Sequence, residues 1–343
     1  MDVRHLNSTE ADESAWTRYV IGQPQATSDH AWAWRRVLEA SFGYAPHYLA
    51  AVDDGRIVGV LPLFRVPRGL RRAALSSVPF GSYGGICADS DDAARALLDA
   101  ACDLMHRLGS DHVELRHRTP LADERLTPHT LYSRFSLPLT GDPAGHLREM
   151  SSTARSKIKK ATRAGLQLLV SRDLDGLYAI HVHTTHRLGS PCFPRRYFEM
   201  ILEAFGDQAA VHYAMLNGQP VAFDLLVMFK SSMVFQYHGS LASSLDCFPN
   251  NFLLWHAIEQ GCLRGMTEVD YCRSRRDSGT AQFKRMLRLV EQPLGYQYAM
   301  ANGHEVPQRH PSNPKYQWMI RMWQRLPGAV TRVMGPALIR YLA

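Results

Sequence analysis

The sequence lacks the signatures of several common protein classes. Its six cysteines form no Cys-x-x-Cys pair, which argues against a zinc ribbon, a dithiol redox motif and a disulfide framework, and favours a reducing compartment. Apolar runs fall short of the roughly 20 residues that span a membrane, and the polar segment Met1–Glu13 has no signal-peptide core. We therefore expect a soluble, cytoplasmic protein that is neither secreted nor integral to a membrane.

Metal ligands are also poorly arranged, although histidine is abundant. Of the 16 histidines, His181, His183 and His186 have the spacing most similar to that of a set of metal ligands. On a helix the first two diverge by about 200° and only the last two share a face, so three ligands would not converge on one ion. Cys272 has no adjacent Cys or His to activate it. We expect neither a metal site nor a cysteine nucleophile.

The length and net charge of the chain indicate the number of domains and the kind of binding partner. A chain of 343 residues with 45% hydrophobic content can form two domains of ordinary size, and its net charge of +7 suits an anionic partner. A nucleotide, CoA, an acidic sugar, tRNA and a membrane surface all meet this condition. No pattern indicates sequence-specific recognition of nucleic acid, so DNA is not an expected partner.

An internal repeat organises the chain. Leu49–Leu63 and Tyr213–Val227 each have the pattern of a strand, a glycine-containing turn and a second strand, with Gly55 and Gly218 at equivalent positions. Each hairpin is followed by a helix ending in glycine and then by a strand, over 94–109 and 112–116 in the first half and over 251–265 and 268–271 in the second. The repeat predicts a tandem α/β protein with two mixed central sheets.

A basic segment lies between the two halves. Ser151–Gly165 predicts a helix that begins with capping serines and ends in glycine, and its Arg155, Lys159 and Arg163 form one cationic face. This face is either a solvated side or a contact for phosphate, tRNA or a diphosphate-linked substrate. Further helices are expected over 174–187 and 194–205.

The C-terminal residues 311–343 predict an amphipathic basic tail. Two short helices, broken by Pro327 and Pro336, would present tryptophan and methionine side chains among arginines. Such a tail either packs on its own domain or makes a peripheral contact with an anionic membrane, which in a cytoplasmic protein is the inner membrane surface.

The stretch 268–284 combines a strand, a cationic turn and a helix start. Glu268–Tyr271 has the pattern of a strand, and Arg273–Thr280 supplies cations, hydroxyls and backbone N–H groups suited to a phosphate or carboxylate. A helix is expected over 282–289. We place the active cleft here. The candidate substrate-binding residues of the stretch are Arg273, Ser274, Arg276, Gly279 and Lys284.

Two carboxylates are candidates for the general base. Asp224 lies in the otherwise apolar strand 221–228, where burial is costly unless the group is paired or functional. It is therefore either the base or one half of a structural ion pair with an arginine. Asp270, at the end of the strand before Cys272, is the second candidate and would alternatively orient Arg273 through a bidentate pair.

The sequence pattern places three further polar residues near the expected active cleft. Tyr237 and His238 end the strand 233–238 and would bring a phenol and an imidazole to the cleft, or form a buried hydrogen-bonded pair. Asn250 begins the next helix as an N-cap or serves as a substrate-binding residue. Tyr237 and His238 join the two carboxylates as candidate catalytic residues.

Three short segments of this stretch resemble the signature of a known family. Val269-Asp-Tyr-Cys-Arg-Ser274, Ser278-Gly-Thr-Ala281 and Phe283-Lys284 are similar to the F-D-F-G-R-S…G-T-G…F-K pattern of FemAB-like proteins. These are acyl and aminoacyl transferases built from two GNAT-type (N-acetyltransferase-like) domains. Cys272 and Ala281 replace glycines of the pattern, and Met286 begins the pair that is usually Trp-Gly.

Other segments extend the resemblance over nearly the whole chain. They are similar to the branch of the family associated with exopolysaccharide and exosortase (PEP-CTERM) loci. The segments are Val78–Gly85, Leu188–Phe198, Phe248–Trp255, Trp323–Pro327 and Gly335–Pro336.

The resemblance implies a fold and an activity. The fold would be two GNAT-like domains with mixed sheets, at 1–150 and 151–310, and a helical tail at 311–343, with the cleft between the domains. The activity would be transfer of an acyl or aminoacyl group to an amine or hydroxyl of a cell-envelope precursor, such as one of peptidoglycan or exopolysaccharide. Acyl-CoA or aminoacyl-tRNA would be the donor, with no tightly bound cofactor.

Two alternatives remain open at this point. The first is a CoA-dependent N-acyltransferase of a small amine or amino sugar. It is suggested by Arg276-Asp-Ser-Gly-Thr-Ala281, which fits the CoA-binding loop of GNAT enzymes, R/Q-x-x-G-x-G/A. The same residues also fit a turn that binds no CoA. The departures from the signature leave a noncatalytic accessory protein of exopolysaccharide assembly as the other alternative. No long helical hairpin of the tRNA-dependent members is evident, which favours CoA over tRNA.

Overall fold

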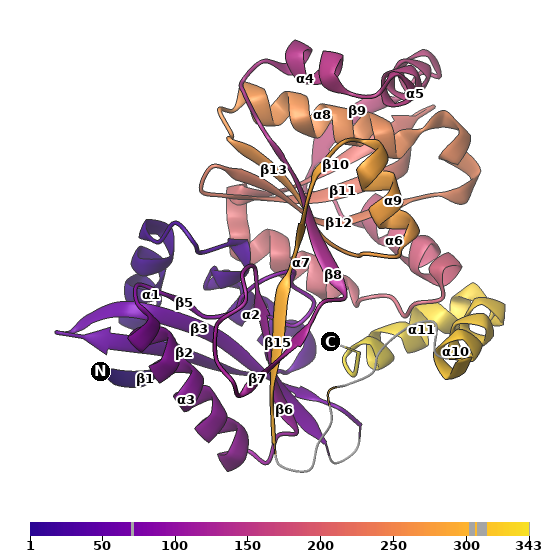
Figure 1. The fold of residues 1–343 in the computed structure, drawn as a ribbon. Coiled ribbons are helices and arrows are strands. Elements are labelled where there is room, and N and C mark those ends of the chain that lie inside the picture. Colours follow the sequence, from indigo (N-terminus) through magenta and orange to yellow (C-terminus); the bar gives the residue numbers. More distant parts are fainter. Residues whose placement is uncertain (70–71, 302–305, 307–313, 343) are drawn as a thin grey trace. The chain divides into compact units, whose positions relative to one another are not determined.

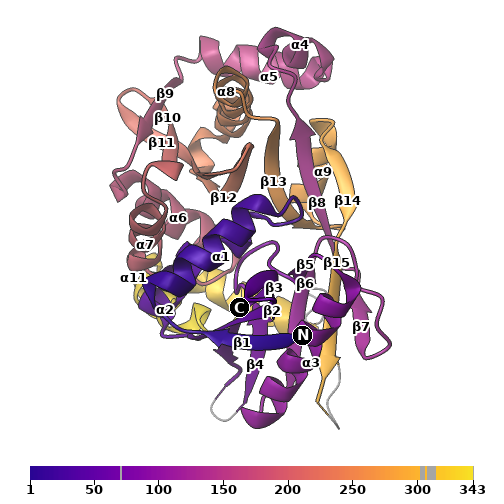
Figure 2. The same ribbon diagram turned by 90° about the vertical axis from the view of Figure 1, so that its left-hand side faces the viewer.

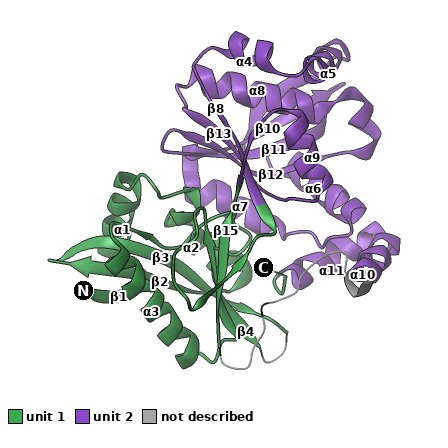
Figure 3. Cartoon of the chain, viewed as in Figure 1, with its two compact units in different colours: residues 1–132, 293–308, 340–343 green, residues 133–292, 309–339 purple. Residues whose placement is uncertain are grey.

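A computed structural model describes residues 1–69, 72–301, 306 and 314–342 of the chain. It divides the chain into two compact units (Figure 3). Unit 1 comprises 1–132, 293–308 and 340–343, and unit 2 comprises 133–292 and 309–339. Each unit has its own sheet and its own core, so each is described by itself.

Unit 1 is built on a mixed sheet with the strand order β1-β2-β3-β4-β6-β15-β7. Its strands are β1 (Asp2–Leu6), β2 (Ala45–Asp53), β3 (Arg56–Pro67), β4 (Ala73–Ser77), β6 (His112–His117), β15 (Gly295–Met300) and β7 (Leu126–His129), with β5 (Cys87–Ala88) paired to β3. Helix α3 (Asp91–Arg107) packs on one face through a cluster that includes Leu97, Leu61 and Leu115. Helices α1 (Glu10–Gly22) and α2 (Ala33–Phe42) contact β3 and β2.

Unit 2 repeats this plan with the order β14-β8-β13-β12-β11-β10-β9. Its strands are β8 (Tyr132–Pro138), β9 (Gln167–Ser171), β10 (Ala209–Leu216), β11 (Gln219–Phe229), β12 (Ser232–Ser240), β13 (Glu268–Arg275) and β14 (Val290–Pro293). Its helices are α4 (Pro143–Glu149), α5 (Ser152–Arg163), α6 (Asp175–Leu188), α7 (Arg195–Phe205), α8 (Pro249–Leu263), α9 (Gly279–Met286), α10 (Pro314–Arg325) and α11 (Gly328–Ile339). Helices α5 and α8 lie on one face of the sheet, and α6 and α7 on the other (Figures 1 and 2).

The two strand orders correspond position by position, which confirms the expected tandem α/β fold with two mixed sheets. The sixth strand of each sheet comes from the other half of the sequence: β15 joins the first sheet and β8 joins the second. Because β15 pairs with β6 and β7, residues 293–308 group with unit 1, although the sequence places them in the segment 151–310.

The hairpin turns have the backbone that their sequences favour. Asp54 and Gly55 have φ values of 45° and 76°, and Asn217 and Gly218 have values of 51° and 75°. A two-residue hairpin turn with positive φ at both central positions suits Asp-Gly and Asn-Gly, because asparagine, aspartate and glycine tolerate left-handed backbone best. The turns fix the registers of β2 with β3 and of β10 with β11.

The helical tail differs from the expectation at one proline. Pro327 separates α10 from α11 as predicted, but Pro336 lies inside α11 and does not break it. Proline cannot donate to the carbonyl four residues earlier, which here is that of Arg332. The Cys192 thiol lies 4.0 Å from that carbonyl oxygen and 3.8 Å from that of Thr331, and donates to them instead.

Gly295 offers a test of how β15 is held in the first sheet. A Cβ added there would lie 2.3 Å from the backbone nitrogen of Pro120, which cannot move without disturbing the loop after β6. We predict that Gly295→Ala lowers the free energy of unfolding by about 2 kcal/mol or more, seen as a fall of several degrees in Tm. Gly22→Ala is the matched control, because a Cβ at Gly22 would have no heavy atom within 4 Å. Equal Tm values for the two variants would contradict the proposed constraint.

Candidate active site

The site begins where two parallel strands of unit 2 separate. β12 and β13 pair at Ser232–Glu268, Met233–Val269 and Val234–Asp270, yet the strands continue to Ser240 and Arg275. We call residues 235–240 of β12 and 271–275 of β13 the fork. Ligands in α/β sheets bind outside the carboxyl ends of parallel strands, next to the helices that follow, and here α8 follows β12 and α9 follows β13.

Irregular backbone on both strands accompanies the separation. Opposite β11, Leu225 faces Tyr237 and Leu226 faces Phe235, so Gln236 is the extra residue of a β-bulge. On β13, Cys272 has φ 55°, a left-handed conformation that costs a non-glycine residue about 1–2 kcal/mol. The glycine that Cys272 replaces in the FemAB-like signature suits this backbone, and the cysteine keeps the geometry without it.

Three buried polar atoms of the fork have no hydrogen-bond partner within the described residues. They are Gln236 Nε2, the Tyr271 hydroxyl and Ser274 Oγ. Buried polar groups are nearly always paired, so each exception needs an explanation. A ligand that enters the fork would supply the missing partners. Of the three, the sequence singled out Ser274 alone.

Lys284 lies beside the fork but differs from its predicted role. It is in the last turn of α9 and buried, not at an exposed helix start. Its Nζ donates to the carbonyl oxygens of Tyr271 and Cys272, and lies 5.3 Å from the centre of the Phe135 ring. Burial lowers the pKa of its ammonium group to about 8. The lysine therefore binds backbone carbonyls that β12 leaves unpaired.

Asp224 stands between two histidines on neighbouring strands. The registers place it opposite His212 of β10 and His238 of β12, so the three side chains share one face of the sheet. Asp224 and His212 are buried and His238 is exposed. The expected alternative, an ion pair of Asp224 with an arginine, is not present among the ion pairs of the described residues. Burial raises the pKa of the Asp224 carboxyl well above its ordinary value.

The surroundings of Asp224 extend to the fork. Burial, and then the neighbouring Asp224 carboxyl, raise the pKa of the Tyr271 phenol. Burial lowers the pKa of His212 to about 4, which leaves that ring neutral at pH 7. An unpaired carboxyl with a raised pKa, near an unpaired hydroxyl, can exchange a proton with a bound group.

Asp270, the second candidate base, has a different environment. Its Oδ2 accepts from Nε of Arg134 on β8 at 3.0 Å, and its Oδ1 accepts from the backbone N–H of Cys272 at 2.8 Å. Arg134 also pairs with Glu268. Asp270 therefore pairs with Arg134, which β8 brings from far along the chain, and its orientation of Arg273 stays a prediction. Asp270 holds the start of the fork in place.

The other candidates fall into different positions. The Tyr237 hydroxyl lies 2.9 Å from that of Tyr197 within an aromatic cluster on α7, on the face opposite to His238. Arg273 and Ser274 lie within β13, because the strand runs to Arg275 and not only to Tyr271. The predicted turn is thus shorter than expected.

The segment after β13 is a helix start and not a left-handed glycine turn. Arg276 is exposed, Ser278 caps α9 by accepting from the Ala281 N–H at 3.2 Å, and Gly279 is the first helical residue. A Cβ at Gly279 would have no heavy atom within 4 Å. The fold itself therefore does not require glycine here.

The N-terminus of α8 lies at the other carboxyl end of the fork. No side chain caps this helix, and its first turn carries no acidic residue. Asn250 is not the N-cap that the sequence suggested; its Nδ2 donates to Ser240 Oγ at 3.4 Å. Two lysines of α5 approach the same end, because Lys157 Nζ and Lys160 Nζ lie 5.7 and 5.9 Å from the centre of the Phe248 ring. Pro249 has no N–H, and the N–H of Asn251 donates to the Phe248 carbonyl oxygen at 3.1 Å. The N–H of Asn250 and the two ammonium groups are therefore what this end offers to an anion.

Lys159 and Arg163 of α5 are exposed, which agrees with the solvated side that the sequence allows, and other residues of the helix approach α8. Arg155 donates to the carbonyl oxygens of Arg148 and Met150, so it closes the preceding turn. Lys157 and Lys160 are the lysines near α8, and their i, i+3 spacing in the same basic segment was a usable signal.

The equivalent region of unit 1 is closed by its own chain. β4 and β6 are also parallel and pair at Leu75–Val113 and Ser76–Glu114. Beyond these pairs, Arg116 donates to the carbonyl oxygens of Val78 and Gly81 at 2.9 Å and to Glu114. The helix that follows, α3, has Asp91 and Asp92 in its first turn, which disfavours an anion. The candidate site thus belongs to unit 2.

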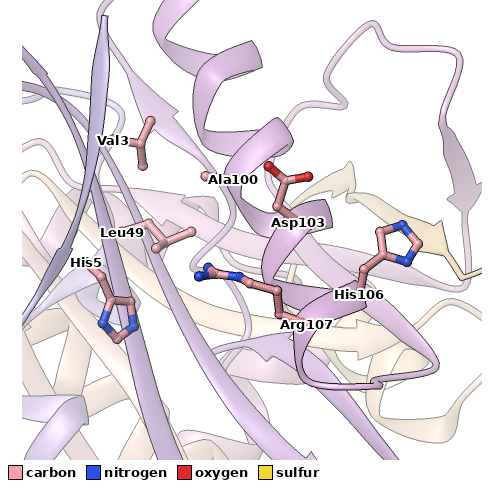
Figure 4. A pocket seen from close by; sticks show the side chains of 7 residues that line it. All are labelled: Val3, His5, Leu49, Ala100, Asp103, His106 and Arg107. Atoms are coloured by element: carbon pink, nitrogen blue, oxygen red, sulfur yellow. The ribbon is translucent and has the colours of Figure 1, made fainter.

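Two hollows lie elsewhere in the units. One in unit 1, of about 510 Å³, lies at the C-terminal end of α3, opposite to the carboxyl ends of β4 and β6 (Figure 4). It is lined by Val3, His5, Leu49, Ala100, Asp103, His106 and Arg107. A smaller one in unit 2, of about 320 Å³, is mainly apolar and lies against α4 and α8. Within the described part of the chain, no group of three or more His, Cys, Asp or Glu side chains could hold a metal ion.

Comparison with known proteins now identifies the fold. A family model described as an acetyltransferase (GNAT) domain matches residues 148–285, which contain the fork and the N-termini of α8 and α9. Both units have the GNAT-like fold. The crystal structure of FemX is similar with a TM-score of 0.66 and 14% identity, over 93% of this chain and 100% of that one. No curated protein matches the chain.

Two other solved structures share the tandem arrangement. A tandem GNAT protein from the clavulanic acid biosynthesis pathway has a TM-score of 0.57 and 12% identity, over 89% of this chain and 99% of its own. The C-terminal domain of a putative lysylphosphatidylglycerol synthetase from Agrobacterium fabrum has a TM-score of 0.57 and 13% identity, over 86% and 93%. At these identities the similarities establish the fold, and the family match over residues 148–285 supports an acyltransferase.

The buried Lys284 gives the site a measurable pH signature. Because its folded pKa of about 8 lies below the ordinary value of 10.5, the unfolded chain binds more protons between these pH values and stability rises with pH across this window. We predict that the free energy of unfolding of the wild type, relative to Lys284→Met, increases by about 3 kcal/mol from pH 8 to 10.5. Urea unfolding at several pH values measures this difference.

The control for this prediction is Lys159→Met, which removes an exposed lysine of α5. This variant should retain the pH dependence of the wild type. If Lys284→Met and the wild type show parallel curves, the ammonium group is not buried as the structure shows.

Proposed function

We propose that this protein transfers an acyl or aminoacyl group to an amine or hydroxyl of a cell-envelope or exopolysaccharide precursor, and that unit 2 holds the donor. The observation that carries the proposal is the fork, with its unpaired Gln236, Tyr271 and Ser274 atoms, close to the Asp224 carboxyl, whose pKa is raised by burial. The family match over the same residues and the similarity to FemX support the reaction class.

The donor would bind through its phosphate groups at the N-terminus of α8. Acyl-CoA and aminoacyl-tRNA both carry phosphate esters, and Lys157 and Lys160 supply charge beside the N–H of Asn250 in the first turn of α8. The acyl group would then extend into the fork, where unpaired donors of the strands can stabilise the oxyanion. Arg273 and Arg276 remain proposed contacts for a phosphate or carboxylate of either substrate.

Asp224 would accept the proton in the chemical step. The acceptor amine or hydroxyl attacks the carbonyl carbon of the donor, the bond from that carbon to sulfur or oxygen breaks, and the donor's thiol or hydroxyl leaves. A base with a raised pKa suits this task near neutral pH. Asp224 would then give this proton to the leaving sulfur or oxygen. His238 lies opposite on the neighbouring strand, and desolvation lowers the pKa of its imidazole to about 4, so its neutral ring would serve as a hydrogen-bond partner and not as a proton carrier.

A small amine or an amino sugar is the alternative acceptor. The noncatalytic alternative loses part of its support, because Cys272 keeps the left-handed backbone that the replaced glycine suits. The departure from the signature at this position therefore leaves the shape of the fork intact.

Donor binding is the first test of the proposal. Calorimetry with acetyl-CoA, longer acyl-CoAs and aminoacyl-tRNA should show saturable binding of one donor class. We predict that the double variant Lys157→Glu, Lys160→Glu weakens that binding at least about tenfold, or 1.4 kcal/mol, since it places two negative charges near the phosphate groups. Lys159→Glu, Arg163→Glu has the same charge change on the same helix and should bind normally.

The outcomes of the binding test separate the hypotheses. A loss in the Lys159 and Arg163 variant alone would assign the donor to the cationic face that the sequence suggested. A loss in Arg276→Ala alone would assign it to the segment before α9. Absence of binding by any donor would refute the transferase and favour an accessory protein.

Substitution of Asp224 should lower activity and not stability, whereas substitution of Asp270 should lower stability. Burial raises the folded pKa of Asp224, so its ionised form destabilises the native state at neutral pH. We predict that Asp224→Asn is at least as stable as the wild type at pH 7 while kcat falls about a hundredfold or more. Asp270→Asn should instead lose about 3 kcal/mol, because it leaves Arg134 with a weakened buried pair.

Urea unfolding and donor turnover measure the two effects. Normal turnover by Asp224→Asn would remove this residue as the base, with donor binding unaffected as the internal control. A destabilised Asp224→Asn would show that the carboxylate is paired in solution.

A further inference from the structure

Helices α10 and α11 are firmly docked on unit 2 by one side. His186 Nε2 lies 3.0 Å from the Leu326 carbonyl oxygen, and Gln324 Nε2 donates to the Arg187 carbonyl oxygen at 2.8 Å. On α11, the buried residues recur every four positions, at Thr331, Gly335 and Ile339. The orientation of both helices is thereby fixed, and so is the side that faces outward.

The close approach of α11 depends on a glycine. A Cβ at Gly335 would lie 2.6 Å from Cys192 Sγ, so only glycine lets the helix sit this close. The docked side carries Thr331, Gly335 and a single large apolar residue, Ile339, and the other large apolar residues of the helix lie on the opposite side. This is the reverse of an ordinary amphipathic surface helix, whose apolar stripe faces the core.

The outward side of α11 is apolar throughout. Val330, Val333, Met334, Ala337 and Leu338 recur with the i, i+3, i+4, i+7, i+8 spacing of one helix face, and all five are exposed. Val333 is 77% exposed. On α10, Trp318, Met319 and Met322 are also exposed, and Trp318 is 63% exposed. Rows of exposed apolar residues on a helix face of this kind indicate an interaction site.

The charged side chains of these two helices are all of one sign. Residues 314–343 contain no Asp or Glu, but five Lys or Arg. On α10, Arg321 and Arg325 form a row next to that of Trp318 and Met322, since both rows have the four-residue spacing of one helix side. An apolar face with flanking arginines and an exposed tryptophan fits the boundary of an anionic lipid layer.

We propose that the outward faces of α10 and α11 form a docking surface for an anionic membrane. The helices would lie in the plane of the lipid surface, with Trp318, Met322, Val333 and Leu338 entering the acyl boundary and the arginines at the phosphates. Among the described residues, no helix is long and apolar enough to cross a membrane, which is consistent with an in-plane contact. The proposal does not depend on the reaction proposed above.

Flotation of the full chain with vesicles tests the docking surface. We expect binding to vesicles of phosphatidylcholine and phosphatidylglycerol in equal parts, weak binding to phosphatidylcholine alone, and loss of binding as salt increases. Val333→Glu should lower the partition coefficient at least about tenfold. Arg321→Glu, Arg325→Glu should lower it about a hundredfold on the mixed vesicles and abolish their advantage over phosphatidylcholine.

The matched control is Leu263→Glu at the end of α8. Leu263 is 70% exposed, so the substitution has the same chemistry at a similar exposure, and it should leave vesicle binding unchanged. Both positions are solvent-facing, and equal Tm values for the two variants confirm intact folding. Absence of binding by the wild type to the mixed vesicles, or equal loss in Leu263→Glu, would overturn the proposal. A wild-type dimer that Val333→Glu converts to a monomer would overturn it too, by assigning the surface to a second copy of the chain.

Discussion

The candidate site depends on the point at which the ladder between β12 and β13 stops. After Val234 and Asp270 the two strands no longer pair, and their buried polar groups need other partners. Lys284 satisfies two carbonyl groups of β13 from the helix that follows it, while atoms of Gln236, Tyr271 and Ser274 stay unpaired. The strand separation thus leaves the polar groups that we propose to bind a substrate.

The two units differ in which groups occupy the separation between their parallel strands. Each has a parallel pair that separates, and each has a carboxylate at the aligned position, Glu114 or Asp270, in an ion pair with a buried arginine. In unit 1, Arg116 and the loop after β4 fill the separation. In unit 2, the arginine comes from β8 and binds at the start of the fork, and polar atoms further along the fork stay unpaired. Duplication of the fold therefore does not imply duplication of the site.

The sequence predicted what is local and periodic. The Asp-Gly and Asn-Gly turns and the tandem sheets follow from spacing alone, and the family signature located the fork. The sequence could not predict the pairing of Arg134 with Asp270, because that contact joins strands 136 residues apart. It also placed Lys284 at a helix start, because the capping Ser278 was not recognised and the helix begins three residues earlier than expected.

The two buried carboxylates, Asp270 and Asp224, differ in how far the fold compensates for their burial. Asp270 accepts two hydrogen bonds, one of them from a guanidinium group, and such a buried pair specifies how β8 and β13 meet. Asp224 has no comparable compensation, and its buried carboxyl weakens the native state whenever it is ionised. An asparagine or an apolar residue would suit the fold of β11 better. A group that the fold does not need, between two histidines and close to the unpaired Tyr271 hydroxyl, is best explained by the chemistry of the site.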